Sequence, residues 1–212
     1  GYESTILFDL KTLKPVRSYV GGMYSSCSPD DKYITSGSIV YDMLTGKKVF
    51  VMDKSSYKLT FSPNGKYIAS LSSKDVVLSN ASDGKLIRTF KEIKKDNGDI
   101  LIRFTPDSKY IIVSDGFNRL FTLVVETGEI LNKYLYSFSR INDFCITNDS
   151  KNIYALNKDS VLVWNLERGN FIKTFAIEKN TCAIDISKDN TFFITLGVEK
   201  GYGPKNIYLR KT

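Results

Sequence analysis

The chain repeats a segment of about ten residues five times. Each copy starts with an apolar or small residue, passes through a polar turn and ends in residues that favour β-strands. The five copies are Cys27-Ser-Pro-Asp-Asp-Lys-Tyr-Ile-Thr-Ser, Phe61-Ser-Pro-Asn-Gly-Lys-Tyr-Ile-Ala-Ser, Phe104-Thr-Pro-Asp-Ser-Lys-Tyr-Ile-Ile-Val, Ile146-Thr-Asn-Asp-Ser-Lys-Asn-Ile-Tyr-Ala and Ile186-Ser-Lys-Asp-Asn-Thr-Phe-Phe-Ile-Thr. Their third positions are 29, 63, 106, 148 and 188, so the steps are 34, 43, 42 and 40 residues. A period of about 40 residues with only strand-like content indicates a protein built from repeated small β-sheets.

Turn residues divide each repeat into four strands, which we label a to d. The Pro-Asp or Pro-Asn segment of the repeat supplies the turn between strands a and b. A second turn, between strands c and d, carries Gly at the position where φ is positive. It occurs as Thr45-Gly46-Lys47, Asp83-Gly84-Lys85, Thr127-Gly128-Glu129 and Arg168-Gly169-Asn170. The triplet Thr12-Leu13-Lys14 lacks this Gly and is therefore predicted to turn less tightly.

These signals predict an all-β protein. The fullest repeat gives strands over Tyr57–Phe61, Tyr67–Leu71, Val76–Ser79 and Leu86–Phe90. Four short antiparallel strands make one blade of a β-propeller, and stacked blades cover each other's faces. We therefore predict a single propeller domain over 1–212 with about five to six blades. The predicted blades are 23–53, 57–90, 99–136 and 141–177, with partial blades at 1–20 and 181–212.

The two partial blades lack different strands. The first has only strands c and d, over Thr5–Phe8 and Val16–Val20. The last has strands a, b and c, over Cys182–Ile186, Phe192–Leu196 and Asn206–Leu209. We therefore expect a piece of a longer propeller with six or more blades, and the alternative is a five-blade ring with one irregular blade.

The repeats resemble the WD-repeat family over nearly the whole chain. The resemblance rests on the turn Phe61-Ser-Pro-Asn-Gly-Lys and on the ends of strand c, Val161-Leu-Val-Trp-Asn, Ile39-Val-Tyr-Asp and Thr5-Ile-Leu-Phe-Asp. The Trp-Asp position of the family holds Phe8-Asp9, Tyr41-Asp42, Ser79-Asn80, Leu123-Val124 and Trp164-Asn165. The chain contains no His, so the hydrogen-bonded tetrad that includes the His of this family's Gly-His pair cannot form. The resemblance implies a propeller fold, which hosts both binding proteins and enzymes.

The composition argues against catalysis. Without His there is no Ser-His-Asp or Cys-His system and no imidazole metal ligand. No glycine-rich phosphate loop is present. The three cysteines, Cys27, Cys145 and Cys182, have no metal-like spacing, and we interpret them as small buried apolar residues in strands. We therefore predict a protein that is not an enzyme and that holds no cofactor or metal.

Charge and hydropathy limit the classes of partner. No apolar run approaches the roughly 18 residues of a spanning helix, so we expect a cytoplasmic protein without a membrane partner. The net charge of +7 is compatible with an acidic partner. Basic residues interleaved with aromatics are absent, which argues against nucleic acid. The expected partner is a protein or peptide, besides the remainder of a larger propeller or multidomain chain.

Two features leave alternatives open. Asp75, Asp115 and Asp159 fall in the b–c connections of three successive repeats. They are either ordinary turn-capping residues or a carboxylate arc for a metal or for acid–base chemistry near a central channel, in an enzyme or a protein that binds a small ligand. Trp164 is either packed between blades or a binding hot spot.

The meander places the connections at two ends of each sheet. The a–b and c–d turns, at one end, repeat closely, whereas the b–c and d–a connections, at the other, differ from repeat to repeat. Loops of the second kind include residues 91–98, 136–140, 177–180 and 198–205. Because functional residues concentrate in variable loops on a rigid scaffold, we predict partner contact there. The predicted anchors are Tyr136, Phe138, Arg140 and Tyr202, and the predicted basic rim is Lys94, Lys95, Lys179 and Lys205.

Overall fold

The fold is all-β, as the sequence predicts. The computed structural model describes residues 4–22, 24–52, 57–72, 75–91, 93, 100–135, 139–178, 181–197 and 206–212. Every regular element within these ranges is a β-strand, and none is a helix. A helix of the length and hydropathy needed to cross a membrane is accordingly not found in the described part of the chain.

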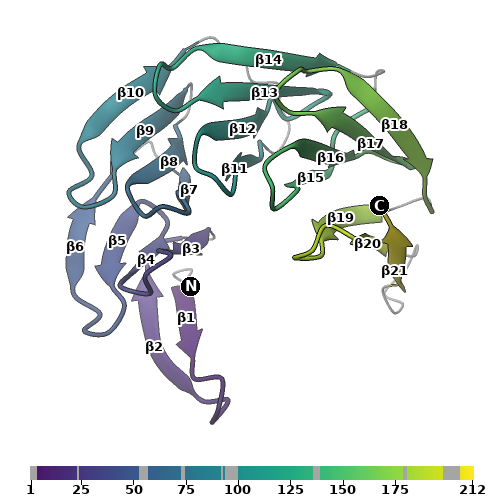
Figure 1. The fold of residues 1–212 in the computed structure, drawn as a ribbon. Helices are drawn as coiled ribbons and strands as arrows, with labels where there is room; N and C mark the ends of the chain where they lie inside the picture. Colours follow the sequence, from purple (N-terminus) through teal and green to yellow (C-terminus); the bar gives the residue numbers. More distant parts are fainter. Residues whose placement is uncertain are drawn as a thin grey trace. The chain divides into compact units, whose positions relative to one another are not determined.

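The strands form six antiparallel sheets in which neighbours in space are consecutive in sequence (Figure 1). Sheet 1 holds β1 (Ser4–Phe8) and β2 (Pro15–Val20). Sheet 2 holds β3 (Ser25–Cys27), β4 (Tyr33–Ser36), β5 (Ile39–Asp42) and β6 (Lys48–Val51). Sheet 3 holds β7 (Tyr57–Phe61), β8 (Tyr67–Leu71), β9 (Val76–Asn80) and β10 (Leu86–Phe90).

The other three sheets follow the same order along the chain. Sheet 4 holds β11 (Ile102–Phe104), β12 (Tyr110–Ser114), β13 (Arg119–Val124) and β14 (Ile130–Leu135). Sheet 5 holds β15 (Asp143–Ile146), β16 (Asn152–Leu156), β17 (Ser160–Asn165) and β18 (Phe171–Ala176). Sheet 6 holds β19 (Thr181–Ile186), β20 (Phe192–Gly197) and β21 (Asn206–Lys211). Sheets 1 and 6 have two and three described strands, as expected for these positions.

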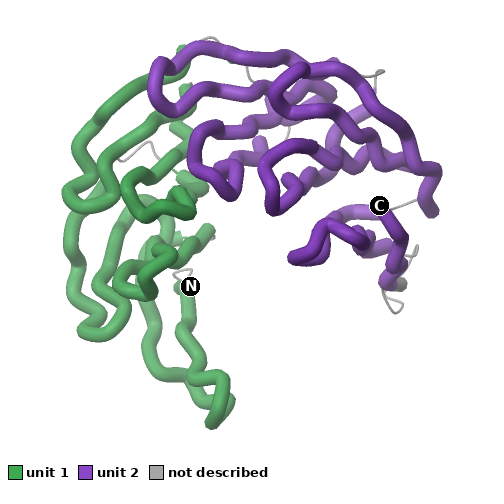
Figure 2. The backbone as a smooth tube through the Cα atoms, in the orientation of Figure 1, with its two compact units in different colours: residues 1–94 green, residues 95–212 purple. Residues whose placement is uncertain are grey.

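The chain divides into two compact units (Figure 2). Unit 1 comprises residues 1–94 with sheets 1 to 3, and unit 2 comprises residues 95–212 with sheets 4 to 6. Inside each unit, apolar side chains from consecutive sheets pack together. Val40 of sheet 2 clusters with Leu59 and Ile68 of sheet 3, and Tyr154 of sheet 5 clusters with Phe193 of sheet 6. Because sheets 4 and 6 both pack on sheet 5, strands b and c of sheet 5 are almost entirely buried.

A hydrogen-bonding unit repeated in five turns explains the sequence repeat. In sheet 2, the Ser28 hydroxyl donates to Asp30 Oδ1 at 2.7 Å and accepts the backbone N–H of Tyr33 at 2.9 Å. Asp30 Oδ1 also accepts the N–H of Lys32 at 3.2 Å. The same three bonds form around Ser62 and Asn64, Thr105 and Asp107, Thr147 and Asp149, and Ser187 and Asp189. The repeat therefore conserves a hydroxyl and a side-chain carbonyl or carboxylate because together they satisfy the turn backbone.

The fifth residue of each repeated ten-residue segment has positive φ. Two of these five residues also bond to a neighbouring turn through their side chains. The five residues are Asp31, Gly65, Ser108, Ser150 and Asn190, with φ between 59° and 70°. In unit 2, Ser150 Oγ accepts the backbone N–H of Asp107 at 3.1 Å, and Asn190 Oδ1 accepts that of Asn148 at 2.7 Å. The a–b turns of sheets 4, 5 and 6 are thus connected by direct hydrogen bonds.

The c–d turn of sheet 1 corrects one expectation. Leu13 has φ of 55°, like the glycines of the other c–d turns, and its N–H donates to the Asp9 carbonyl at 2.8 Å. In the c–d turn of sheet 2, the corresponding hydrogen bond from the Gly46 N–H to the Asp42 carbonyl measures 2.9 Å. The turn without Gly is therefore equally tight, and the prediction of a looser turn is wrong. The reason is the Asp9 carboxylate, which accepts the backbone N–H groups of Lys11 and Thr12 and holds the turn closed.

Replacing Leu13 with Gly is expected to stabilise the protein. A non-glycine residue pays about 1–2 kcal/mol in the left-handed region, partly offset by the greater flexibility of Gly in the unfolded chain. Leu13 is exposed and little packing is lost, so the free energy of unfolding should rise by about 0.5–1 kcal/mol, measured by urea denaturation. The matched control is Leu44→Gly, since Leu44 is an exposed c–d turn residue without positive φ. An equal gain in the control would contradict the explanation.

The turn carboxylates make stability depend on acid pH. The hydroxyl of Ser187 and the N–H of Thr191 lower the pKa of Asp189 from 3.8 to about 2. A carboxylate whose pKa is lower in the folded state stabilises the fold above its unfolded pKa, and this contribution disappears as the pH falls from about 4 to about 2. Asp189→Asn should flatten the pH dependence of urea denaturation in this range, because Asn64 already supports the same bonds in sheet 3. The reverse change, Asn64→Asp, should steepen it.

Candidate partner-binding surface

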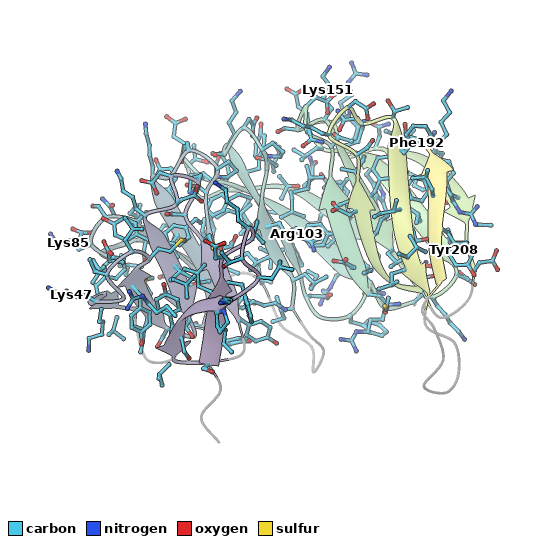
Figure 3. All side chains as sticks on the ribbon, turned by 90° about the horizontal axis from the view of Figure 1, so that it is seen from below. Lys47, Lys85, Arg103, Lys151, Phe192 and Tyr208 are labelled. Carbon is cyan, nitrogen blue, oxygen red and sulfur yellow. The ribbon has the colours of Figure 1, made fainter. Side chains whose placement is uncertain are left out.

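At the end of the sheets with the a–b and c–d turns, many aspartates bond within their own turns. Their partners include lysines of the same turns: Lys32 lies 3.3 Å from Asp30, Lys85 lies 3.1 Å from Asp83, and Lys151 lies 3.7 Å from Asp149. Lys85 and Lys151 project away from the sheets in Figure 3. Exposed pairs of this kind add little stability, but they cancel charge locally.

Most residues of the predicted surface fall outside the described part of the chain. These are Lys94, Lys95, Tyr136, Phe138, Lys179, Tyr202 and Lys205. Arg140 is described and is exposed. Other residues at the same end of each unit, where the b–c and d–a connections lie, are described.

In unit 1, this end presents Tyr24 and Lys58. The Lys58 ammonium lies 4.8 Å from the centroid of the Tyr24 ring, which is the geometry of a cation–π contact. Lys58 lies in β7 with φ of 53°, and the pairing of β7 with β8 is irregular between Tyr57 and Thr60. A non-glycine residue with positive φ inside a strand marks a bulge, and bulges redirect side chains. The bulge thus coincides with the placement of a cation over the aromatic ring of the preceding sheet.

Gly37 fixes the position of Tyr24. Gly37 has φ of 57°, and its N–H donates to the Tyr24 carbonyl at 3.1 Å. A Cβ at this position would overlap the carbonyl group of Gly21. The b–c connection of sheet 2 and the d–a connection before it therefore approach closely only because both positions are glycine.

In unit 2, a buried carboxylate organises the b–c loop of sheet 4. Asp115 is fully buried, and its Oδ1 accepts the N–H groups of Phe117 at 2.9 Å and Arg119 at 3.1 Å. Its Oδ2 accepts Nε of Arg119 at 2.5 Å. All these bonds are local, so Asp115 acts as a loop cap, and it holds the Phe117 side chain at 40% exposure.

The same loop is joined to the next d–a connection. The N–H of Ile141 donates to the Phe117 carbonyl at 2.6 Å, which brings Arg140 next to the loop. Phe117 of the b–c connection, Arg119 at the start of β13 and Arg140 of the d–a connection therefore lie at one end of unit 2. Their combination of an exposed aromatic ring with two guanidinium groups is typical of protein-binding surfaces, in which aromatic residues and Arg are enriched.

Two of the three carboxylates considered for catalysis, those of Asp115 and Asp159, bond within their own connections. Asp159 Oδ1 accepts the Ser160 hydroxyl at 2.8 Å, and the backbone of Asp75 is paired with Ser72 in its own connection. Asp115 is occupied as described above. Over the described ranges, no group of three or more His, Cys, Asp or Glu side chains has the arrangement of a metal site.

A second buried carboxylate joins three sheets of unit 2. Asp143 Oδ1 lies 2.9 Å from the Arg103 guanidinium of β11, and its Oδ2 accepts the N–H of Ile184 in β19 at 3.1 Å. The guanidinium also stacks 5.0 Å above the Phe144 ring. Because both carboxylate oxygens are occupied by Arg103 and a backbone N–H, this pair holds the strands a of sheets 4, 5 and 6 together.

The burial of Trp164 and of the three cysteines tests two predictions from the sequence. Trp164 is buried and packs against Tyr134, with ring centroids 5.7 Å apart, so its role between sheets is confirmed. Cys145 is buried, and burial raises the pKa of its thiol to about 12. Cys27 and Cys182 are exposed, so the prediction that all three are buried is wrong. Cys27 ends the short edge strand β3, and Cys182 lies where the pairing of β19 with β20 is irregular.

Sequence reasoning missed four surface residues, Tyr24, Lys58, Phe117 and Arg119. Phe117 has a visible signal, because it is a large aromatic residue between the turn formers Gly116 and Asn118. Lys58 has none, since its backbone conformation depends on the irregular pairing of β7.

Comparisons with known proteins leave the family open. Neither the protein-family models nor the curated proteins include a match to this chain.

Proposed function

We propose that this chain is a WD-repeat-like β-propeller, or part of one, that binds a protein or peptide through the b–c and d–a end of its sheets. The observation that carries the proposal is the meeting of two variable connections at this end of unit 2. The N–H of Ile141 donates to the Phe117 carbonyl, so exposed Phe117 and exposed Arg140 come from connections that touch.

An acidic partner fits this surface best. Arg140 is exposed and carries a guanidinium group, which binds carboxylates in a planar, two-bonded geometry, and Phe117 provides apolar area. The net charge of +7 adds a long-range attraction for acidic chains. The proposed role is therefore that of an adaptor that holds an acidic protein segment without chemical change.

The test compares capture by three forms of the immobilised chain. Partners of the proposed surface should bind the unaltered chain and should be lost with Phe117→Ala plus Arg140→Ala. They should be retained with Lys32→Ala plus Lys66→Ala, which alters two a–b turns. For a partner so identified, calorimetry should give a loss of about 2 kcal/mol or more for Phe117→Ala. Loss of binding in the a–b variant with retention in the Phe117 and Arg140 variant would place binding at the other end.

A further inference from the structure

The a–b turn of sheet 3, between β7 and β8, contains one of the two Asn-Gly pairs of the sequence (Figure 1). Asn64 and Gly65 are both exposed. In an Asn-Gly pair the backbone nitrogen of Gly attacks Cγ of the preceding side chain with little steric hindrance, because Gly has no Cβ. A bond forms between Gly65 N and Asn64 Cγ, Nδ2 takes up a proton and leaves as ammonia, and a cyclic succinimide remains. Water then opens this ring to aspartate or to isoaspartate, depending on which carbonyl it attacks.

The folded turn holds both reacting groups in hydrogen bonds. The Gly65 N–H donates to the Ser62 carbonyl at 2.9 Å. Asn64 Oδ1 accepts the Ser62 hydroxyl at 2.7 Å and the Lys66 N–H at 3.0 Å. Attack requires the Gly65 nitrogen to lose the proton that it donates to Ser62, and it requires the Asn64 side chain to leave its two donors. The reaction therefore has to wait until the turn opens.

Four equivalent turns show how this backbone accommodates aspartate. The residues at the position of Asn64 are Asp30, Asp107, Asp149 and Asp189, and each accepts the corresponding hydroxyl and backbone N–H. In sheet 2, Lys32 lies 3.3 Å from the Asp30 carboxylate, and Lys66 has the matching position in sheet 3. An aspartate at position 64 therefore keeps the hydrogen bonds of the turn and gains a cation nearby.

Isoaspartate does not fit the same turn. Its main chain passes through Cγ, so the chain is longer by a methylene group and the carboxylate stays on Cα. Ser62 is fully buried, and its hydroxyl would lose the acceptor that it has in the native turn. The longer main chain would also disturb two bonds that frame the turn, from the Ser62 N–H to the Tyr67 carbonyl at 2.9 Å and from the Ala81 N–H to the Lys66 carbonyl at 3.0 Å. The turn thus discriminates between two products of equal mass.

We propose that Asn64 is a deamidation site that reacts when its turn opens, and that the native fold accepts the aspartate product and rejects the isoaspartate product. The reaction replaces an amide with a carboxylate, so it lowers the net charge of +7 by one. The site lies in an a–b turn and is separate from the connections proposed for partner binding.

Peptide mapping by mass spectrometry tests whether opening of the turn controls the reaction. The chain is incubated in mildly alkaline buffer with and without denaturing urea, and deamidation at Asn64 is followed over time. A synthetic peptide of residues 60–70 gives the reference rate in both buffers. The chain should react at the peptide rate in urea and more slowly by about tenfold or more without it, because each 1.4 kcal/mol of opening free energy slows the reaction about tenfold. Gly65→Ala should slow the reaction in urea, because the added Cβ hinders the attacking nitrogen.

A refolding step tests the discrimination between the two products. After reaction in urea, the chain is refolded by dilution and treated with a protease that digests unfolded molecules. The surviving native fraction should contain aspartate at position 64 and be depleted of isoaspartate, the two being distinguished by radical fragmentation in the mass spectrometer. The other Asn-Gly pair, Asn97-Gly98, lies outside the described residues. Its products form independently of those at position 64 and do not change this ratio.

The variant Asn64→Asp reproduces the accepted product without a refolding step. In neutral buffer, its midpoint of urea denaturation should lie at or above that of the unaltered chain. The matched control Asn64→Ala removes the acceptor of both bonds and should have a lower midpoint. Three results would each overturn the proposal: equal rates with and without urea, a native fraction that keeps isoaspartate in the ratio in which it formed, or an Asn64→Asp variant as unstable as Asn64→Ala.

Discussion

Trp164→Ala is expected to cost about 3–5 kcal/mol of the free energy of unfolding, which is typical for removal of a large buried aromatic residue. Trp164 is 4% exposed and lies between sheets 4 and 5. Its ring packs on Tyr134 of sheet 4 and lies 6.0 Å from Phe171 of its own sheet. Because the neighbouring strands are hydrogen-bonded on both sides, the cavity left by the indole cannot close easily. Urea denaturation followed by circular dichroism measures the loss.

The control for this prediction is Phe171→Ala. Phe171 touches the same tryptophan but is 44% exposed, so its truncation should cost much less. If the two changes have similar effects, Trp164 does not contribute the packing that its position indicates. Because the indole is buried between sheets, it can affect partner affinity only through the stability of the fold. The Trp164→Ala variant therefore measures stability separately from direct contact with a partner.

Gly37→Ala is expected to cost about 2–4 kcal/mol, as the sum of left-handed backbone strain and a collision with the backbone. The added Cβ meets the carbonyl group of Gly21, which is main chain and cannot rotate away. The control is Gly65→Ala, where φ is +70° but the nearest atom outside the turn is Pro29 Cγ at 3.5 Å. That variant should lose only the backbone contribution, about 1–2 kcal/mol.

The Gly37→Ala variant should also change the contact between Tyr24 and Lys58 in unit 1. Displacement of Gly37 breaks its hydrogen bond to the Tyr24 carbonyl, so the contact between the Tyr24 ring and Lys58 should weaken. The chemical shifts of the Lys58 side chain should then move toward values for a solvated ammonium. Unchanged shifts together with a large loss of stability would show that Gly37 supports the sheet but not the position of Tyr24.

The strands were predictable from sequence because both local and tertiary preferences agree. Residues 67–71 favour strands by composition, are bounded by turn residues, and are almost entirely buried. The a–b turns were predictable for a similar reason, since the hydroxyl and carboxylate that satisfy the backbone lie within a few residues of each other.

The misjudged features depend on groups that the repeat pattern does not contain. The turn at Leu13 is tight because the Asp9 carboxylate caps it, which a search for Gly overlooks. Lys58 acquires positive φ from an irregular pairing with β8. The burial of Cys27 and Cys182 was misjudged because a strand edge or an irregular pairing leaves the side chain open to solvent. Candidate site residues are harder to predict than strands, because variable loops carry no internal pattern.

The direct bonds between neighbouring a–b turns determine where the chain tolerates extra residues. Ser150 and Asn190 accept backbone N–H groups of the preceding turns, so a residue inserted in any of these turns would shift the acceptor and break the register with its neighbour. The unequal steps of 34 to 43 residues between repeats arise outside these turns, which all have the same length. A peptide tag or a reporter domain is therefore better inserted outside the a–b turns than in a turn such as 148–151.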